Sequence, residues 1–220
     1  MGIFDFFKRQ PPAATLNDLI LPSAGWEPHE QTDAVRSWFG DDRVPVRALR
    51  VPDPSPVPID LGVARAHYTA ESGEMGGVLV ELEVVEAAAG SVLRSVFKYP
   101  APNNPMATYI VGILLLSWPD AHIRIHVEDM EHGTTGGREA AVMVILGDAW
   151  PKSDEPPVVV DSMEEMFERM AAARAQHRVL PSDDRTYDAS FPHHPLSRVR
   201  ALQAKILDAM VLRDGVALSG

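Results

Sequence analysis

The fold is decided by one apolar stretch, NPMATYIVGILLLSWP, which runs from Asn104 to Pro119. Asparagine is a favoured helix N-cap, proline is favoured at the first helical position, and Pro119 closes the stretch. Its length and these boundary residues predict a helix over 105–118, which is apolar nearly all round and should be buried. The β-branched residues between Thr108 and Val111 favour the competing interpretation, a central strand.

Upstream of this stretch, segments 78–86 and 91–99 alternate apolar and polar residues and so predict a hairpin. Their charged side chains share one face, with acids on the first strand opposite bases on the second. Opposite charges across paired strands are typical of a solvent-exposed sheet face, which explains all four residues without a functional role. These residues are Glu81, Glu83, Arg94 and Lys98.

Downstream, segments 121–129 and 138–146 predict a second hairpin. The stretch 132–137 between them, HGTTGG, resembles a phosphate-binding loop in composition. It lacks the spacing of such loops, and it joins two predicted strands where a phosphate loop would lead into a helix. A glycine-rich hairpin turn is therefore the favoured interpretation.

The remaining segments complete an α+β fold. Apolar periodicity predicts helices at 33–39, 162–177 and 196–213. A strand is predicted at 63–70, whereas five prolines within 44–60 predict an extended linker or sheet edge. We expect an antiparallel sheet of about five strands packed against helices, in the order α-β-β-β-α-β-β-α with an additional C-terminal helix.

This organisation divides the chain into three parts. They are an amphipathic N-terminal tip at 1–12, an α+β core at 13–150, and a helical portion at 151–220 packed on the core. From 33 to 178, the order of helices and strands resembles that of the bacterial secretion chaperones, although no residue motif carries the resemblance. It implies an acidic, often dimeric protein of the bacterial cytosol that binds other proteins.

Composition narrows the classes of function. The chain has 20 lysines and arginines against 31 aspartates and glutamates, a formal charge of −11, which disfavours nucleic acid as a partner. It has no cysteine, which excludes disulfides and thiolate catalysis, and no motif indicates a cofactor. The first residues lack the pattern of a secretory leader, and the apolar run 107–118 is too short to cross a bilayer, so we expect a cytoplasmic protein.

One predicted strand carries a metal-ligand pattern. His122, His126 and Glu128 are spaced by even numbers of residues, so a strand places all three on one face, where they could bind a divalent metal. Arg124 lies between the two histidines and would repel a cation. A solvated strand face is therefore the competing interpretation.

A second candidate is the polar loop 181–195. It contains the pair His193 and His194, and loops of this length often carry function. Its acids could complete an acidic or metal site, and disorder of the loop or its docking onto the sheet are the alternatives. These acids are Asp183, Asp184 and Asp188.

Two apolar stripes could bind a partner. One lies in the tip, where residues 1–9 could dock on a membrane surface or on another protein through Ile3, Phe4 and Phe7. The other lies on the helix predicted after Ser162, and methionine-rich faces adapt to varied partners. Its residues are Met163, Met166 and Met170, and a place in the core is the favoured interpretation of these side chains.

The sequence as a whole favours a non-catalytic protein-binding accessory or chaperone-like module. One alternative is a metal-dependent hydrolase that uses the His122, His126 and Glu128 face or the His193-His194 loop. The other is an immunity-type inhibitor, which would also be acidic and cytosolic. The expected partner is another protein, and a homodimer through sheet edges or helices is compatible with the same pattern.

Overall fold

The computed structural model describes residues 15–52, 60–118, 121–151, 162–166, 168–169 and 178–213. A seven-stranded antiparallel sheet packed with helices confirms the α+β class, and this sheet is larger than the expected one of about five strands. The strand order is β2-β3-β4-β8-β7-β6-β5. The bounds are β2 (Glu27–Gln31), β3 (Val35–Phe39), β4 (Pro45–Val51), β5 (Val78–Ala87), β6 (Gly90–Ala101), β7 (Asn104–Trp118) and β8 (Ala121–Met130).

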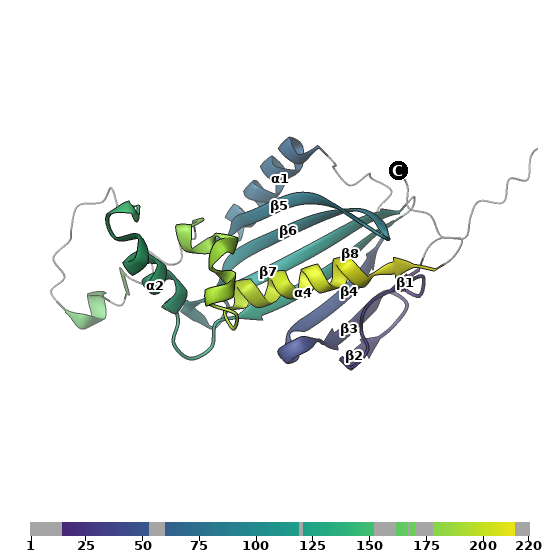
Figure 1. Cartoon of the computed structure of the whole chain (residues 1–220), viewed down its shortest axis with the longest axis horizontal. Helices are drawn as coiled ribbons and strands as arrows, with labels where there is room; N and C mark the ends of the chain where they lie inside the picture. Colours follow the sequence, from purple (N-terminus) through teal and green to yellow (C-terminus); the bar gives the residue numbers. More distant parts are fainter. Residues whose placement is uncertain are drawn as a thin grey trace, which may run out of the picture.

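Helices and a small second sheet surround this sheet. The helices are α1 (Leu61–Glu74), α2 (Gly137–Leu146) and α4 (Pro195–Ala209). Short 3-10 helices are η1 (Asp41–Arg43), η2 (Gly147–Ala149), η3 (Pro181–Asp183) and η4 (Arg185–Ser190). The second sheet pairs β1 (Leu19–Ile20) with β9 (Val211–Leu212). In Figure 1, α4 crosses one face of the large sheet, α1 lies along the β5 edge, and α2 lies at one end of the molecule.

The decisive stretch is a strand, so the helix predicted over 105–118 is wrong. β7 pairs with β6 on one side and with β8 on the other, near the centre of the sheet. Asn104 caps no helix; its side-chain oxygen accepts a hydrogen bond from the amide of Met106 at 3.0 Å. Strands covered on both faces read as continuous apolar runs, which is why this one resembles a buried helix.

The first predicted hairpin is confirmed, but its charged face is not exposed to solvent. β5 pairs with β6 and places Glu83 directly opposite Arg94. Arg94 is only 5% exposed and Lys98 only 3%. Gln203 of α4 contacts Arg94, and Asp183 of η3 contacts Lys98, so these two elements cover the face that the sequence assigns to water.

The second predicted hairpin is half correct. Its first strand is β8, but segment 138–146 forms helix α2. The stretch 132–137 therefore leads from a strand into a helix and is not a hairpin turn. Gly136, at a φ of 70°, precedes the first helical residue.

Three further assignments are wrong, and with them the expected order of elements. Segment 33–39 is strand β3, held between β2 and β4. Segment 63–70 lies inside α1, which Asp60 caps by accepting hydrogen bonds from the amides of Gly62 and Val63. Segment 44–60 contributes the inner strand β4, where Pro45 is tolerated because it is the first residue. Residues 53–59 lie outside the described part.

The predicted C-terminal helix is confirmed as α4. The main core lies between this helix and the sheet. The helix ends at Ala209 and not at 213, because β9 follows it. Leu196, Val199 and Ile206 are fully buried and pack with the apolar side chains of the central strands.

The opposite face of the sheet is covered differently. Helix α1 packs on β5, and a smaller apolar cluster joins it to β6 and β7. On this face of β8, by contrast, the side chains from Arg124 to Glu128 are half-buried and polar.

Candidate functional site

A groove lies on the sheet face opposite α4, between α1 and β8. Its volume is about 480 Å³, within the range of roughly 300–1,000 Å³ that is typical of ligand sites. Aromatic and aliphatic side chains of α1, β6 and β7 line one side, and polar side chains of β8 line the other. Strand alternation explains this lining, because the odd-numbered residues of β7 and the even-numbered residues of β8 share this face.

Aromatic rings form the apolar side of the groove. Tyr68 of α1 meets the edge of Phe97 with 5.9 Å between ring centroids, and Phe97 stacks on Tyr99 at 6.1 Å. Tyr109 of β7 adds a further ring. Gly77 makes room for this arrangement, because a Cβ there would lie 2.2 Å from the ring of Tyr99. Burial, reinforced by the charge of Glu71, raises the pKa of Tyr99 to about 12.

Glu128 occupies the polar side. Its carboxylate accepts hydrogen bonds from Arg47 at 3.2 Å and from the hydroxyl of Tyr109, and Nδ1 of His126 lies 3.5 Å away. His126, together with Tyr109 and Arg47, outweighs the effect of burial and lowers the pKa of Glu128 to about 2. Burial and the neighbouring Glu128 raise the pKa of Tyr109. At neutral pH, Glu128 is therefore ionised and Tyr109 is protonated.

Arg124 carries an unmatched charge in the same groove. Its cross-strand neighbours are Leu49 of β4 and Leu115 of β7, neither of which can pair with a cation. The side chain is half-buried, and within the described ranges it makes no hydrogen bond or ion pair. Tyr68 and Arg124 both line the groove; burial raises the pKa of Tyr68, and the charge of Arg124 opposes that rise.

The metal ligands predicted on β8 are brought together only in part. His126 and Glu128 meet in the groove, whereas His122 lies beyond Arg124 on the same face and is 5% exposed. The two oxygens of Glu128 already accept hydrogen bonds from Arg47 and Tyr109. A metal held by these three residues stays a prediction.

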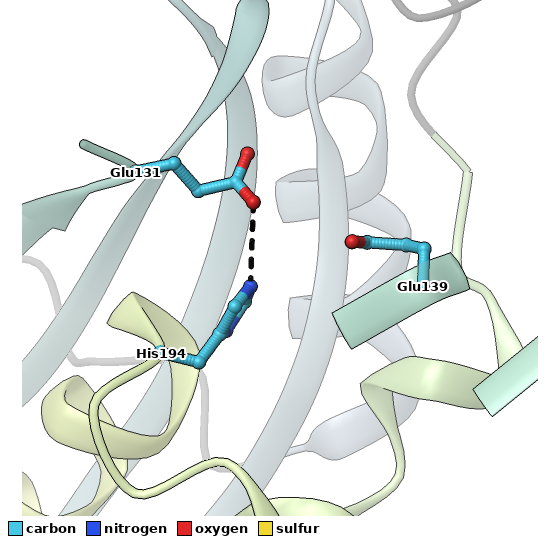
Figure 2. Close-up of side chains that lie close together, drawn as sticks. All are labelled: Glu131, Glu139 and His194. Atoms are coloured by element: carbon cyan, nitrogen blue, oxygen red, sulfur yellow. Dashed lines mark ion pairs between the residues drawn. The ribbon is translucent and has the colours of Figure 1, made fainter. Parts of the chain in front are cut away.

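Metal-type ligands gather instead in the Glu131 cluster, which consists of Glu131, Glu139 and His194 (Figure 2). Their ligand atoms all lie within 4.8 Å of one another. The three residues come from the end of β8, the first turn of α2 and the N-cap of α4. His194 belongs to the histidine loop that the sequence indicates, but no sequence pattern points to the two glutamates.

Hydrogen bonding within the Glu131 cluster disfavours a metal. Nδ1 of His194 accepts a hydrogen bond from the amide of Leu196 at 3.2 Å, so the neutral ring carries its proton on Nε2. It is Nε2 that faces Glu131, at 3.7 Å, and a metal would need the lone pair of that atom. The cluster is better described as a carboxylate facing an imidazole N–H.

Glu131 occupies the position that an external anion would take beside the glycine-rich stretch at the start of α2. Its carboxylate accepts hydrogen bonds from the amides of Gly136 at 2.8 Å and Thr108 at 2.9 Å. Burial alone would raise the pKa of Glu131, but His194 and these two amides outweigh burial and lower it to about 2. The negative charge that a helix N-terminus favours is thus supplied by the chain itself.

The acids of the predicted polar loop serve the fold. Asp183 pairs with Lys98 at 2.7 Å, and both side chains are nearly fully buried. Asp188 forms ion pairs with Arg138 at 2.9 Å and with Arg200 at 2.8 Å. These pairs dock η3 and η4 against the sheet and α4, which is the alternative interpretation of the loop.

The predicted partner-binding residues are only partly within the described ranges. Ile3, Phe4, Phe7 and Met170 lie outside them. Met163 is 64% exposed and Met166 is half-buried, in a segment where the side chain of Ser162 accepts a hydrogen bond from the amide of Glu165. Partner binding through these side chains stays a prediction.

Sequence reasoning missed the groove. Leu93, Phe97 and Tyr99 share a face of β6, in agreement with the alternation predicted for 91–99. Tyr109 lies directly opposite Tyr99, and only a strand at 104–118 reveals that pairing. Alternation along β8, once paired with that strand, would have placed Arg124 in an aromatic groove. From the sequence alone, Arg124 is notable only as a neighbour of two histidines.

Comparisons with known proteins add little to this description. No protein-family model matches the sequence, and no curated protein matches it. Among solved structures, the chain is similar to the Ran-binding protein Mog1p of Saccharomyces cerevisiae, with a TM-score of 0.42 and 11% sequence identity over 92% of this chain and 89% of that chain. None of the described helices is long and apolar enough to cross a membrane.

Proposed function

We propose that this protein is a non-catalytic binding module and that the groove between α1 and β8 receives a segment of another protein. The observation that carries the proposal is the aromatic groove, which presents several rings on one side and fixed polar groups on the other. Tyrosine, phenylalanine and arginine are enriched in the buried centres of protein interfaces. A chaperone-like accessory and an immunity-type inhibitor would both act in this way.

The protonation states of Glu128 and Tyr99 disfavour these two groups as a general acid or base. A general acid or base is most effective when its pKa lies near the working pH. The pKa of Glu128 is about 2 and that of Tyr99 about 12, so neither group exchanges protons readily near neutrality. They offer constant donors, acceptors and charge to a bound segment.

The proposal can be tested with random peptides displayed on phage and selected on the purified full chain. Ile113 is a half-buried groove residue of β7, and Ile113→Trp would fill the groove without changing its charge. Val144→Trp is the matched control, because Val144 is 78% exposed on α2, outside the groove. We expect the selected peptides to bind the wild type and the control but to lose at least about tenfold in affinity for Ile113→Trp.

Two results would count against this function. One is a selection that yields no binding peptide, and the other is equal binding of the selected peptides to both variants. Near-ultraviolet circular dichroism and thermal unfolding of Ile113→Trp separate a filled groove from a damaged fold.

A further inference from the structure

We infer that Arg124 binds a carboxylate of the docked segment, so that the partner presents an acidic group beside an aromatic or large aliphatic side chain. The inference rests on the proposed function and names the chemistry that the groove selects. It follows from the charges in the groove, from the surroundings of the guanidinium and from the apolar side opposite it.

The acids of the groove lie beside residues other than Arg124. Glu128 accepts a hydrogen bond from Arg47 at 3.2 Å, and Glu71 lies 3.8 Å from Nε2 of His67. Arg124 has no such partner in the described part of the chain. Arginine stays protonated in proteins, so its charge cannot be removed by loss of a proton and favours an anion from outside.

The surroundings of Arg124 strengthen that preference. Leu49 and Leu115 flank Arg124 across the sheet, so its side chain leaves the sheet between two apolar residues. A half-buried charge in such surroundings attracts an opposite charge more strongly than an exposed one does. The planar guanidinium also matches a carboxylate with two parallel hydrogen bonds.

The overall charge of the chain disfavours a highly acidic partner. At a formal charge of −11, the protein repels polyanions such as nucleic acid, whereas a single carboxylate can be compensated by one arginine. The rings of Tyr68 and Phe97 then provide an apolar site for the side chain next to that carboxylate. An acidic residue adjacent to an apolar one on a protein segment meets both requirements.

Two small probes test this chemistry on the full chain. N-acetyl-phenylalanine carries a carboxylate next to an aromatic ring, and N-acetyl-phenylalanine amide is its neutral counterpart. In nuclear magnetic resonance titrations of the nitrogen-15-labelled protein, we expect the carboxylate to shift the amide signals of β7 and β8 and to bind about tenfold more tightly than the amide. In Arg124→Gln, this preference should fall below about twofold, whereas Arg124→Lys should retain part of it.

Arg43→Gln is the matched control for charge, because it removes one cation from an exposed site beside Glu27, away from the groove. This variant should keep the full preference for the carboxylate.

Equal affinities of the two probes for the wild type would overturn the role of Arg124 while leaving the groove as a docking site. If neither probe shifts β7 and β8, both the inference and the proposed function fail. If the carboxylate preference depends on Arg124 but no peptide binds the groove, Arg124 is a carboxylate site, and the docking of a protein segment and with it the proposed function fail.

Discussion

Gln203 of α4 occupies the space beside Gly112 of β7, where a Cβ on the glycine would lie 2.6 Å from Nε2 of the glutamine. The glutamine is fixed there, because Nε2 donates to the carbonyl of Ser95 at 3.1 Å and Oε1 accepts from Nε of Arg94 at 3.0 Å. Val199 approaches the same point, also at 2.6 Å. A glycine in the middle of this central strand therefore allows α4 to approach the sheet closely.

Gly112→Ala should destabilise the protein. The added methyl group would displace α4 or break the hydrogen bonds of Gln203, and overpacking of this kind typically costs about 1–3 kcal/mol. Urea unfolding followed by circular dichroism measures the loss. Gly73→Ala, inside α1, is the control, since its Cβ would meet nothing within 4 Å and should be neutral or stabilising. A Gly112→Ala variant as stable as the control would show that α4 shifts without cost.

The buried ion pair between Lys98 and Asp183 gives a second prediction. Removal of either partner leaves an unpaired buried charge, so Lys98→Met and Asp183→Leu should each reduce the free energy of unfolding by about 3–5 kcal/mol. The double variant should recover part of that loss, because no isolated charge remains. A double-mutant cycle in urea measures the coupling, and strictly additive single effects would refute it.

Acid should weaken the fold in a defined range of pH. The pKa of Glu131 is lowered from its ordinary 4.5 to about 2 in the folded protein, so this carboxylate stabilises the fold above pH 4.5. That contribution should disappear as the pH falls from about 4.5 to about 2. Thermal unfolding of wild type and Glu131→Gln across this range tests it, with Glu74→Gln as the exposed control. An unchanged pH profile in Glu131→Gln would contradict the assignment.

Zinc or manganese should leave the protein unchanged. The imidazole of His194 directs an N–H toward Glu131, and the carboxylate of Glu131 is held by two amides, so neither is free to bind a metal. We expect less than about 1 °C of change in melting temperature in the presence of excess metal, and no stoichiometric metal in elemental analysis of the purified chain. A clear rise in melting temperature that disappears in Glu139→Gln would instead reveal a metal site.

The local parts of the fold were predictable, and the parts that depend on distant partners were not. Alternation of residues 78–99 was enough for the first hairpin, and the stripe from Leu196 to Ile206 was enough for α4. β7 was not predictable in this way, because a strand covered on both faces has no alternation. Segment 33–39 has helical spacing, and only its pairing with β2 and β4 makes it a strand.

For the site, the sequence predicted the types of residue on one strand face but not the neighbours that surround them. The even spacing of His126 and Glu128 correctly placed them on one face of β8. Their neighbours Arg47 and Tyr109 come from strands whose pairing the sequence does not reveal. For the same reason, nothing in the sequence distinguished the buried face of β6, which carries Lys98, from a solvated one.

The pairing of β1 with β9 has a mechanical consequence. Leu19 lies opposite Leu212 and Ile20 opposite Val211, so the chain enters and leaves this ladder at the same end. A force that pulls the two flanking segments apart would first load Leu16, which is buried in the main core and whose carbonyl accepts a hydrogen bond from Arg36 of β3, and would then act on these two pairs one after another. Rupture of the ladder would detach Leu19 and Met210, both buried in the main core, and so start unfolding at the α4 face.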